Sequence, residues 1–427
     1  MIKRAILQAI EKHLIEPEVT VLIGARQVGK TYLMKLLQRN LESKGEKTVF
    51  LNLDVEDDKQ FLASQTGLIN YLHLQFGDKK GFVFIDEIQR KDEVGLFLKG
   101  IYDMHLPYKF IVSGSGSLDI KAKIKESMAG RKQLFVIEPV SFSEFVDFKT
   151  DYQYEDRLHN FFFVEDSKTQ ALLEEYMMFG GYPRVLLADT GEKKRSVMDE
   201  IYRSYIEKDI TGLLSVEKPD AFTSLLKIMA SQIGSLVNVR ELSGTIGVSE
   251  KTIQHYLWYL EQTYILKKLT PYYTNVRSEI TKAPIYYFCD VGLRNYLLGL
   301  FGLSNIPSVL SGHLFENIIF NMLHEHAHSS SAGIHFWRTK DNAEVDFVIN
   351  TGLNIIPIEV KHTKLKASEM TRSFKSFLVK YKPANAFIVH LGSSYETEFN
   401  KTKIFLTPFY ESGDILDLPQ RPPENIT

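Results

Sequence analysis

Residues 24–31 read Gly-Ala-Arg-Gln-Val-Gly-Lys-Thr and match the phosphate-binding loop G-x-x-x-x-G-K-[ST] at every fixed position. The apolar residues 19–23 before this loop are typical of a buried strand, and residues 32–37 after it have the apolar spacing of a helix. This context suits the motif, because backbone N–H groups and a helix N-terminus attract phosphate oxygens. The stretch therefore predicts a nucleotide phosphate site rather than a chance match.

Each residue type of the loop has an expected role. Gly24 and Gly29 allow the backbone conformations that turn N–H groups toward phosphate. Lys30 is expected to place its charge on the β- and γ-phosphates of ATP, and the Thr31 hydroxyl is expected to ligate Mg²⁺. We expect the whole loop to surround the nucleotide: Gly24, Ala25, Arg26, Gln27, Val28, Gly29, Lys30 and Thr31.

Four more apolar stretches follow the loop, at residues 48–53, 81–86, 109–115 and 134–137. Near-continuous apolar strands that alternate with helical patterns are typical of a parallel sheet covered on both faces. The predicted fold class is therefore α/β, with a P-loop sheet over residues 1–148.

The strand at 82–85 ends in two acids, as a Walker B strand does. Asp86 is expected to hold Mg²⁺, directly or through water, and Glu87 to orient or deprotonate the water that attacks the γ-phosphate. The alternative is that the two acids cap the next helix, but the intact phosphate loop favours catalysis.

Two further residues carry open interpretations. Ser113 either senses the γ-phosphate at a strand end or belongs to a Ser-Gly turn. Arg131 either stabilises the charge of the transferring phosphate, in its own chain or in a neighbouring subunit, or is a surface arginine.

Composition limits the remaining classes. A chain of 427 residues is expected to form two or three domains, and a net charge of −2 gives no global signal for nucleic acid. The single cysteine, Cys289, excludes an intramolecular disulfide, and the N-terminus lacks the apolar segment of a signal peptide, so we expect a cytoplasmic protein. Because 18 apolar residues never follow one another, no membrane partner is expected.

Several short motifs together resemble one prokaryotic family, the AAA-type ATPases that carry a C-terminal domain of unknown function numbered 4143. They are the loop itself, Phe-Ile-Asp-Glu-Ile-Gln at 84–89, Val-Ser-Gly-Ser at 112–115, Met-Ala-Gly-Arg at 128–131, and residues 139–145, 180–183 and 288–293. The resemblance covers nearly the whole chain and implies an AAA-like sheet with Lys30, Thr31, Asp86, Glu87 and Ser113 in the roles given above. Tyr32 departs from the family, which usually has a small residue or threonine there.

The middle of the chain divides into two predicted parts. Residues 149–219 are expected to form a helical lid or connector with a turn at 180–183, and Arg184 beyond this turn either contacts the nucleotide or is solvated. Residues 220–295 have the order of a winged helix: helices at 239–246 and 249–260, a turn at 247–249, and strands at 265–269 and 285–288.

The predicted winged helix has two possible partners. On DNA, the residues facing the groove would be Lys251, Thr252, Gln254 and His255, while Lys267 and Lys268 would contact phosphate. The alternative is a spacer or protein-binding surface, because the local excess of positive charge is small.

Residues 296–412 contain a constellation that looks like the PD-(D/E)XK nuclease core. It combines a helix around Glu316 with a hairpin of strands 343–349 and 355–361. Asp346 and Glu359 would bind a hard divalent metal ion, Glu316 would complete its ligands, and Lys361 would orient the attacking water. The alternative is an amphipathic hairpin without chemistry.

Residues 324–328 spell H-E-x-x-H, the zinc protease signature. The motif falls at a helix end, where a histidine-rich terminus is the simpler interpretation. The sequence thus predicts a Mg-dependent ATPase coupled to a DNA-binding or nuclease-like C-terminal domain. The alternative is an ATP-dependent switch for a protein partner with an inert C-terminal domain. A homo-oligomer is a further open possibility.

Overall fold

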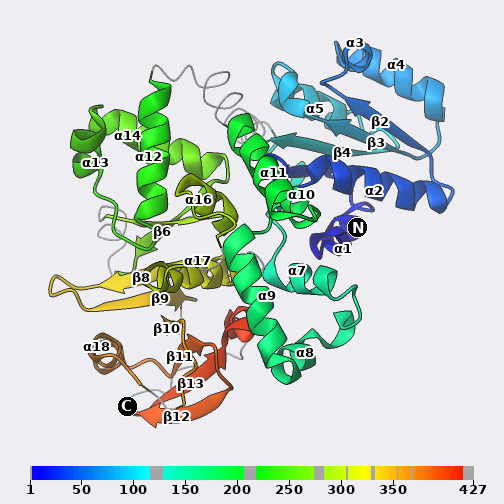
Figure 1. Ribbon diagram of the computed structural model, residues 1–427. Helices are drawn as coiled ribbons and strands as arrows, with labels where there is room; N and C mark the ends of the chain where they lie inside the picture. The colour runs from blue at the N-terminus through cyan, green and yellow to red at the C-terminus, as the bar shows by residue number, and fades with distance from the viewer. Residues whose placement is uncertain are drawn as a thin grey trace, which may run out of the picture.

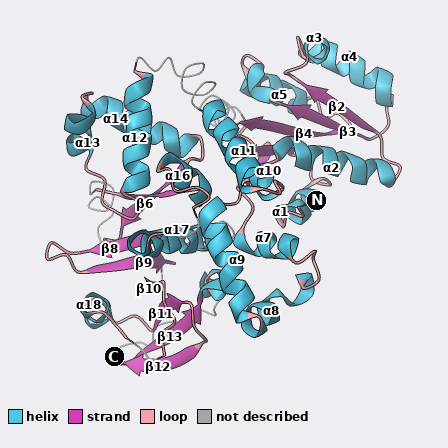
Figure 2. Ribbon diagram, viewed as in Figure 1, coloured by secondary structure: helices cyan, strands magenta, loops and turns pink. Residues whose placement is uncertain are grey.

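The computed structural model describes residues 2–115, 128–205, 218–273, 283–303, 306–327, 332–352, 354–366 and 369–416. Two sheets organise these residues, one in the N-terminal part and one in the C-terminal part, and most of the helices lie between and around them (Figure 1, Figure 2).

The N-terminal sheet has five parallel strands in the order β2-β3-β4-β1-β5. Its strands are β1 (Val19–Gly24), β2 (Thr48–Asn52), β3 (Gly81–Asp86), β4 (Tyr108–Ser115) and β5 (Lys132–Ile137). The predicted α/β fold with a parallel P-loop sheet is therefore confirmed, because each strand follows one of the apolar stretches in the sequence.

Both faces of this sheet are buried, as continuous apolar strands require. On one face, Leu22 and Phe84 pack in the same apolar cluster as Leu33 and Met34 of α2 (Lys30–Ser43). On the other face, Val21 and Val83 belong to a separate cluster that the remaining helices of this region cover. These helices are α3 (Glu56–Phe61), α4 (Gln65–Phe76) and α5 (Val94–Asp103). The sheet is thus sandwiched between helices, with its strand ends left for the site.

A group of helices connects the N-terminal sheet to the rest. They are α7 (Phe142–Lys149), α8 (Leu158–Val164), α9 (Asp166–Phe179), α10 (Pro183–Leu186) and α11 (Gly191–Ser204), while α1 (Ile6–His13) packs on β5. A capping box starts α7, where Ser141 accepts from the Glu144 N–H and Glu144 in turn binds the Ser141 N–H. In Figure 1, α10 and α11 lie beside the phosphate-loop helix α2.

The next segment has the predicted order of helices and strands. It contains α12 (Pro219–Ser231), α13 (Val239–Ile246), α14 (Glu250–Gln262), and the antiparallel strands β6 (Leu266–Pro271) and β7 (Ile285–Phe288). Gly247 ends α13 in a left-handed conformation, and the Ser249 side chain caps α14 by accepting from the Thr252 N–H. The turn chemistry read from the sequence therefore forms this helix–turn–helix pair.

The C-terminal sheet has eight strands in the order β12-β13-β11-β10-β9-β8-β6-β7. Its further strands are β8 (Gly333–Arg338), β9 (Glu344–Asn350), β10 (Ile355–Lys361), β11 (Asn385–His390), β12 (Tyr395–Phe399) and β13 (Thr402–Pro408), and its helices are α16 (Val291–Leu297), α17 (Ser308–Ala327) and α18 (Arg372–Tyr381). Strand β6 pairs in parallel with β8 at Thr270 and His335, so this sheet continues across the boundary that we predicted at 295. In the described part of the chain, every helix is too short or too polar to span a bilayer.

Candidate nucleotide-binding site

The phosphate loop has the backbone that its glycines allow. Gly24 ends β1 with φ +149°, and Gly29 precedes α2 with φ +96°. A Cβ atom at Gly24 would lie 2.1 Å from the Ile137 carbonyl oxygen, so a larger residue does not fit against β5. The loop therefore depends on glycine at the point where it leaves the sheet and at the point where it enters the helix.

Three polar residues meet at the carboxyl ends of neighbouring strands. The Thr31 hydroxyl at the start of α2 lies 2.7 Å from Asp86 Oδ2, and the Ser113 hydroxyl of β4 donates to Asp86 Oδ1. Asp86 and Ser113 are both buried. Parallel strands that end at one sheet edge bring residues 31, 86 and 113 together although they lie far apart in the sequence.

Lys30 and Glu87 complete this edge. The Lys30 ammonium donates to the carbonyl oxygens of Gly24 and Ala25, at 3.0 and 2.6 Å. Glu87 has a left-handed backbone with φ +55°, and its carboxylate accepts a hydrogen bond from the side chain of Gln89. Burial raises the pKa of Glu87 above its ordinary value, and the Asp86 carboxylate beside it adds to the rise.

A cavity of about 560 Å³ opens over the loop. Besides loop residues it is lined by Glu87 and by Arg184 of α10, whose guanidinium donates to Gln27 at 2.8 Å and pairs with Glu200 at 2.7 Å. Arg184, an open candidate in the sequence, thus lies at the cavity rather than on a remote surface. Two lining residues gave no signal in the sequence because they are ordinary apolar residues from distant segments: Ile2 and Leu187.

Arg131 does not lie at this cavity. It immediately precedes β5, and its carbonyl oxygen accepts from the N–H of Val19, which begins β1. Its guanidinium pairs with Asp103 at 2.8 Å. Since β1 runs from Val19 to Gly24, Arg131 lies at the opposite edge of the parallel sheet, and the expectation that it reaches the phosphate of its own chain was wrong.

The residues predicted to contact DNA differ in how exposed their side chains are. Lys251, Gln254 and His255 are exposed on α14, Thr252 is half-buried, and Lys268 is exposed on β6. Trp258, which the sequence analysis did not single out, is 45% exposed and stacks on His255. Lys267 is buried and pairs with Glu138 at 2.6 Å, so the prediction that it contacts phosphate was wrong.

The four nuclease-like residues lie on adjacent elements, as predicted. Helix α17 carries Glu316, and the antiparallel pairing of Ile358 with Phe347 places Asp346 of β9 across from Glu359 of β10. Lys361 pairs with Glu359 at 2.8 Å, and the other Glu359 oxygen, Oε2, is buried without a hydrogen-bond partner.

The carboxylates of this cluster are held by protein groups. The Tyr287 hydroxyl donates to Glu316, and the Val360 N–H donates to Asp346 at 2.7 Å. Burial raises the pKa of Asp346 well above its ordinary value, and the charges of Glu316 and Glu359 add to the rise. Throughout the residues that the structure describes, no group of three or more His, Cys, Asp or Glu side chains is arranged to hold a metal ion. The metal centre expected from Glu316, Asp346 and Glu359 therefore stays a prediction.

The H-E-x-x-H motif does not form a zinc site in the described residues. His324 and Glu325 lie in the last turn of α17, which ends at Ala327, and His328 lies outside the described residues. His326 bonds the Met322 carbonyl oxygen at 2.9 Å, as a residue of a helix end does.

Three family models match successive parts of the chain. An AAA domain matches residues 16–146, a domain of unknown function (DUF8612) matches residues 170–304, and a second domain of unknown function (DUF4143) matches residues 311–410. The AAA match covers the phosphate loop and all five strands of the N-terminal sheet, and the DUF4143 match begins within α17.

Relatives come from bacteria and an archaeon. An uncharacterized protein of Mycobacterium tuberculosis is 26% identical over 379 residues, covering 88% of this chain and 76% of its own length. Uncharacterized proteins of Methanocaldococcus jannaschii and Haemophilus influenzae are each 24% identical, covering 81% and 80% of this chain and 75% and 82% of their own lengths.

Solved structures give weaker matches. AMPPCP-bound DnaA from Aquifex aeolicus is 13% identical, covering 60% of this chain and 86% of that one with a TM-score of 0.26. Cdc6p from Pyrobaculum aerophilum is 12% identical, covering 69% and 92% with a TM-score of 0.27. TM-scores this low mean that the structures do not superpose over the whole chain.

Proposed function

We propose that the chain, which joins an AAA domain to a C-terminal DUF4143 domain, is an AAA-type ATPase of that architecture and hydrolyses ATP to ADP and phosphate. The observation that carries the proposal is the meeting of Thr31, Asp86 and Ser113 beside the phosphate loop. Hydroxyl and carboxylate oxygens are the ligands that Mg²⁺ prefers, so Thr31 and Asp86 suit the metal of Mg-ATP. The metal would neutralise phosphate charge as the γ-phosphate is transferred.

Each of the other residues at this edge of the sheet has a separate role in ATP hydrolysis. Lys30 binds the β- and γ-phosphates, and the loop amides of residues 24–31 hold the phosphate oxygens. Glu87 accepts a proton from the attacking water, and its raised pKa brings its proton affinity closer to neutral pH. Ser113 contacts Asp86 and thereby holds it in place beside Thr31.

Arg184 is proposed to bind the nucleotide from the connector. It lines the cavity beside Gln27 and Glu200, and Pro183 next to it lies close to Gly29. The charge of an arginine on the connector can pair with the oxygens of the terminal phosphate. The position of the connector then depends on whether the γ-phosphate is present.

We propose that the nucleotide state is transmitted to residues 219–288 and their contact with DNA. The support is a continuous set of contacts: the Tyr182 and Tyr205 hydroxyls lie 3.0 Å apart, and the Gly181 N–H donates to Asp290 at 2.6 Å. Asp290 caps α16, and Arg294 of the same helix donates to the carbonyl oxygen of Ala230 in α12. The exposed face of α14 with Lys251, Gln254 and His255 would then read DNA as a winged helix does.

A second candidate function is an ATP-dependent switch for a protein partner, with an inert C-terminal domain. It is favoured by the cluster of Glu316, Asp346 and Glu359, whose first two carboxylates are engaged by Tyr287 and Val360. Nuclease activity requires these carboxylates to be released toward a metal ion.

One experiment tests both functions. ATP hydrolysis by the full chain is measured with Mg²⁺ and with Mn²⁺, with and without duplex DNA, while the integrity of the DNA is followed on a gel. DNA binding that weakens with salt supports the DNA proposal, and its absence at low salt supports the protein switch. If the Lys30→Ala protein hydrolyses ATP normally, the assigned ATPase site is wrong.

A further inference from the structure

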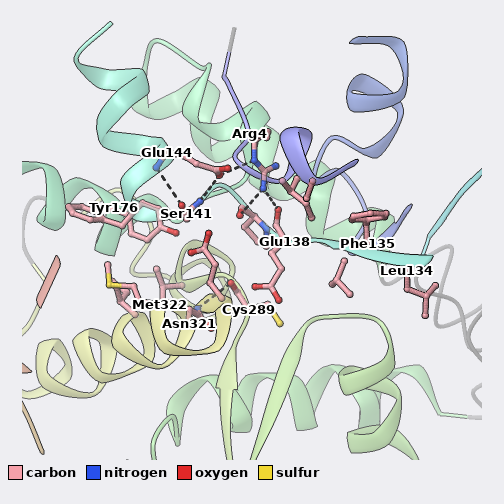
Figure 3. A pocket seen from close by; sticks show the side chains of 18 residues that line it. Arg4, Leu134, Phe135, Glu138, Ser141, Glu144, Tyr176, Cys289, Asn321 and Met322 are labelled. Atoms are coloured by element: carbon pink, nitrogen blue, oxygen red, sulfur yellow. Dashed lines mark hydrogen bonds and ion pairs between the residues drawn. The ribbon is translucent and has the colours of Figure 1, made fainter. Parts of the chain in front are cut away.

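A second cavity, separate from the nucleotide cavity, lies between the N-terminal sheet and the C-terminal helices (Figure 3). Its volume is about 480 Å³, which is the size of small-molecule pockets. One wall comes from β5 and the segment leading into α7, and the opposite wall comes from the face of α17 that carries Asn321 and Met322. No predicted role falls on this cavity.

Most of the ionisable side chains that line the cavity are carboxylic acids. Three carboxylates line it, from Glu138, Glu144 and Glu325. Arg4 pairs with Glu144 at 2.9 Å, and Lys267 pairs with Glu138 at 2.6 Å. Burial raises the pKa of Glu325 to about 7; the charges of Glu144 and Glu138 add to the rise, and those of His326 and Lys267 oppose it. A cation in the cavity would therefore favour the ionised form of the Glu325 carboxyl.

Two donor groups of the lining, those of Arg4 and Tyr176, are already engaged in hydrogen bonds. Every nitrogen of the Arg4 guanidinium is already used: it donates to Glu144 and to the carbonyl oxygens of Val28, Glu138 and Pro139. The Tyr176 hydroxyl donates to the Val140 carbonyl oxygen at 2.8 Å. An anionic ligand would have to compete for these donors, whereas the three carboxylates of the lining favour a cation.

Aromatic rings form part of the wall. Phe135, Phe142 and Tyr176 line the cavity, and the rings of Phe142 and Tyr176 meet edge to face at 5.6 Å. Aromatic faces attract alkylammonium and guanidinium groups and provide apolar surface for the carbon chain between them.

We propose that this cavity binds a small organic cation with Glu325 as its counter-charge. The ligand is an alkyl chain that carries an amine at one end and an amine or a guanidine at the other. One charged end pairs with Glu325, and the methylene chain packs against the rings of Phe135 and Phe142. The pairing opposes the negative potential of the three carboxylates and leaves the Arg4–Glu144 and Lys267–Glu138 ion pairs formed.

The ligand also regulates the proposed ATPase, and this step rests on the proposed function. Arg4 lines both cavities: it donates to Val28 of the phosphate loop at 3.2 Å and to Glu144 at the second cavity. The charges of Glu144 and Glu325 act on each other, so a cation paired with Glu325 weakens the attraction of Arg4 to Glu144 and changes the contact of Arg4 with the loop. Sites joined in this way change each other's affinity reciprocally.

The test measures agmatine and putrescine binding to the full chain by calorimetry without nucleotide, in the wild type and in the Lys30→Ala protein. These arms do not depend on ATP hydrolysis, so failure of the ATPase proposal leaves them interpretable. We expect both cations to bind and the neutral isostere 1,4-butanediol not to bind. Glu325→Gln should weaken binding about tenfold or more, since a hydrogen bond to a charged group is lost. Glu398→Gln, an exposed acid on β12, is the matched control and should not change binding.

Four results would overturn the proposal: no binding of either cation, equal binding of butanediol, undiminished binding to the Glu325→Gln protein, or binding of a short arginine peptide but not of the free amines. The last result would mean that the cation bound in the cavity is a basic side chain of a protein partner and not a free amine. In the regulatory arm, saturating agmatine should change the affinity of the wild type for ATP at least about threefold. An unchanged ATP affinity despite agmatine binding would refute the regulatory step alone.

Discussion

The nucleotide site and the carboxylate cluster of the C-terminal sheet both consist of acids at the ends of strands, yet their surroundings differ. Asp86 faces Thr31 and Ser113 beside an open cavity of about 560 Å³. Glu316 and Asp346 instead accept hydrogen bonds from Tyr287 and from the Val360 backbone. The acid of the nucleotide site thus lies beside space for a ligand, whereas the two acids of the carboxylate cluster are hydrogen-bonded to other groups of the protein.

The difference shows what a motif guarantees. Most of the phosphate site comes from eight consecutive residues whose backbone determines where the ligand lies, so its geometry follows from local sequence. The carboxylate cluster draws residues from one helix and two strands, and a neighbouring element, β7, supplies the hydroxyl that engages Glu316. Residues gathered by packing can serve packing alone.

The largest expected effect is on the nucleotide side. Lys30→Ala should lower ATP hydrolysis at least about a thousandfold, because the charge on the β- and γ-phosphates is removed at the point where negative charge develops. Hydrolysis and ATP binding are measured together. Lys35→Ala, an exposed lysine on the same helix, is the control and should retain wild-type rates. If the Lys30→Ala protein hydrolyses ATP at the normal rate, the phosphate loop is not the catalytic site, and the nucleotide site no longer differs from the carboxylate cluster in having a ligand.

Glu87→Gln should separate binding from chemistry. The amide keeps the size of the side chain but cannot accept the proton, so the turnover number should fall about 10²–10³-fold while the affinity for ATP stays close to that of the wild type. Equal loss of affinity and turnover would instead place Glu87 among the residues that bind the nucleotide. Single-turnover assays with a separate nucleotide-binding measurement distinguish these outcomes.

Asp290 caps α16 and accepts a hydrogen bond from the connector at Gly181. We expect its ionisation to make the stability of the protein depend on pH. Burial raises its pKa from 3.8 to about 6, so in the folded protein the ionised form is disfavoured. This contribution to stability is complete below pH 4 and is lost as the pH rises through 6, by up to about 3 kcal/mol. The free energy of unfolding of the wild type, relative to Asp290→Asn, should fall between pH 4 and pH 8. A difference that does not change with pH would contradict the assigned burial of the charge.

The smallest expected effect tests the carboxylate cluster directly. Tyr287→Phe removes the hydroxyl that engages Glu316 and keeps the packed ring, so it should cost about 1–2 kcal/mol of unfolding free energy. If the cluster is a masked metal centre, the same protein should gain Mn²⁺ binding, measured by calorimetry without nucleotide and with Thr31→Ala in the background to weaken the nucleotide-site metal position. A second change, Asp346→Asn, should then abolish it. No gain of Mn²⁺ binding would leave the cluster a structural feature.

Sequence patterns predicted the elements well where local chemistry decides them. The strands at 81–86 and 355–361 and the helix cap at Ser249 formed as expected, because apolar alternation and capping act within a few residues. Arg131 and Lys267 show the limit. Both are basic residues near strands, but one lies at the far edge of its sheet and the other is buried against Glu138.

The sequence by itself determined the phosphate loop, the parallel sheet and the acids at the end of β3, since each follows from residues that are neighbours along the chain. Only the tertiary structure decided that Arg184 lies at the nucleotide cavity, that strands β6 and β8 join two predicted domains into one sheet, and that Glu325 lines a second cavity together with Glu138 and Glu144. These depend on which distant segments pack together. Packing is set by the burial of apolar surface over the whole chain, and no local pattern encodes it.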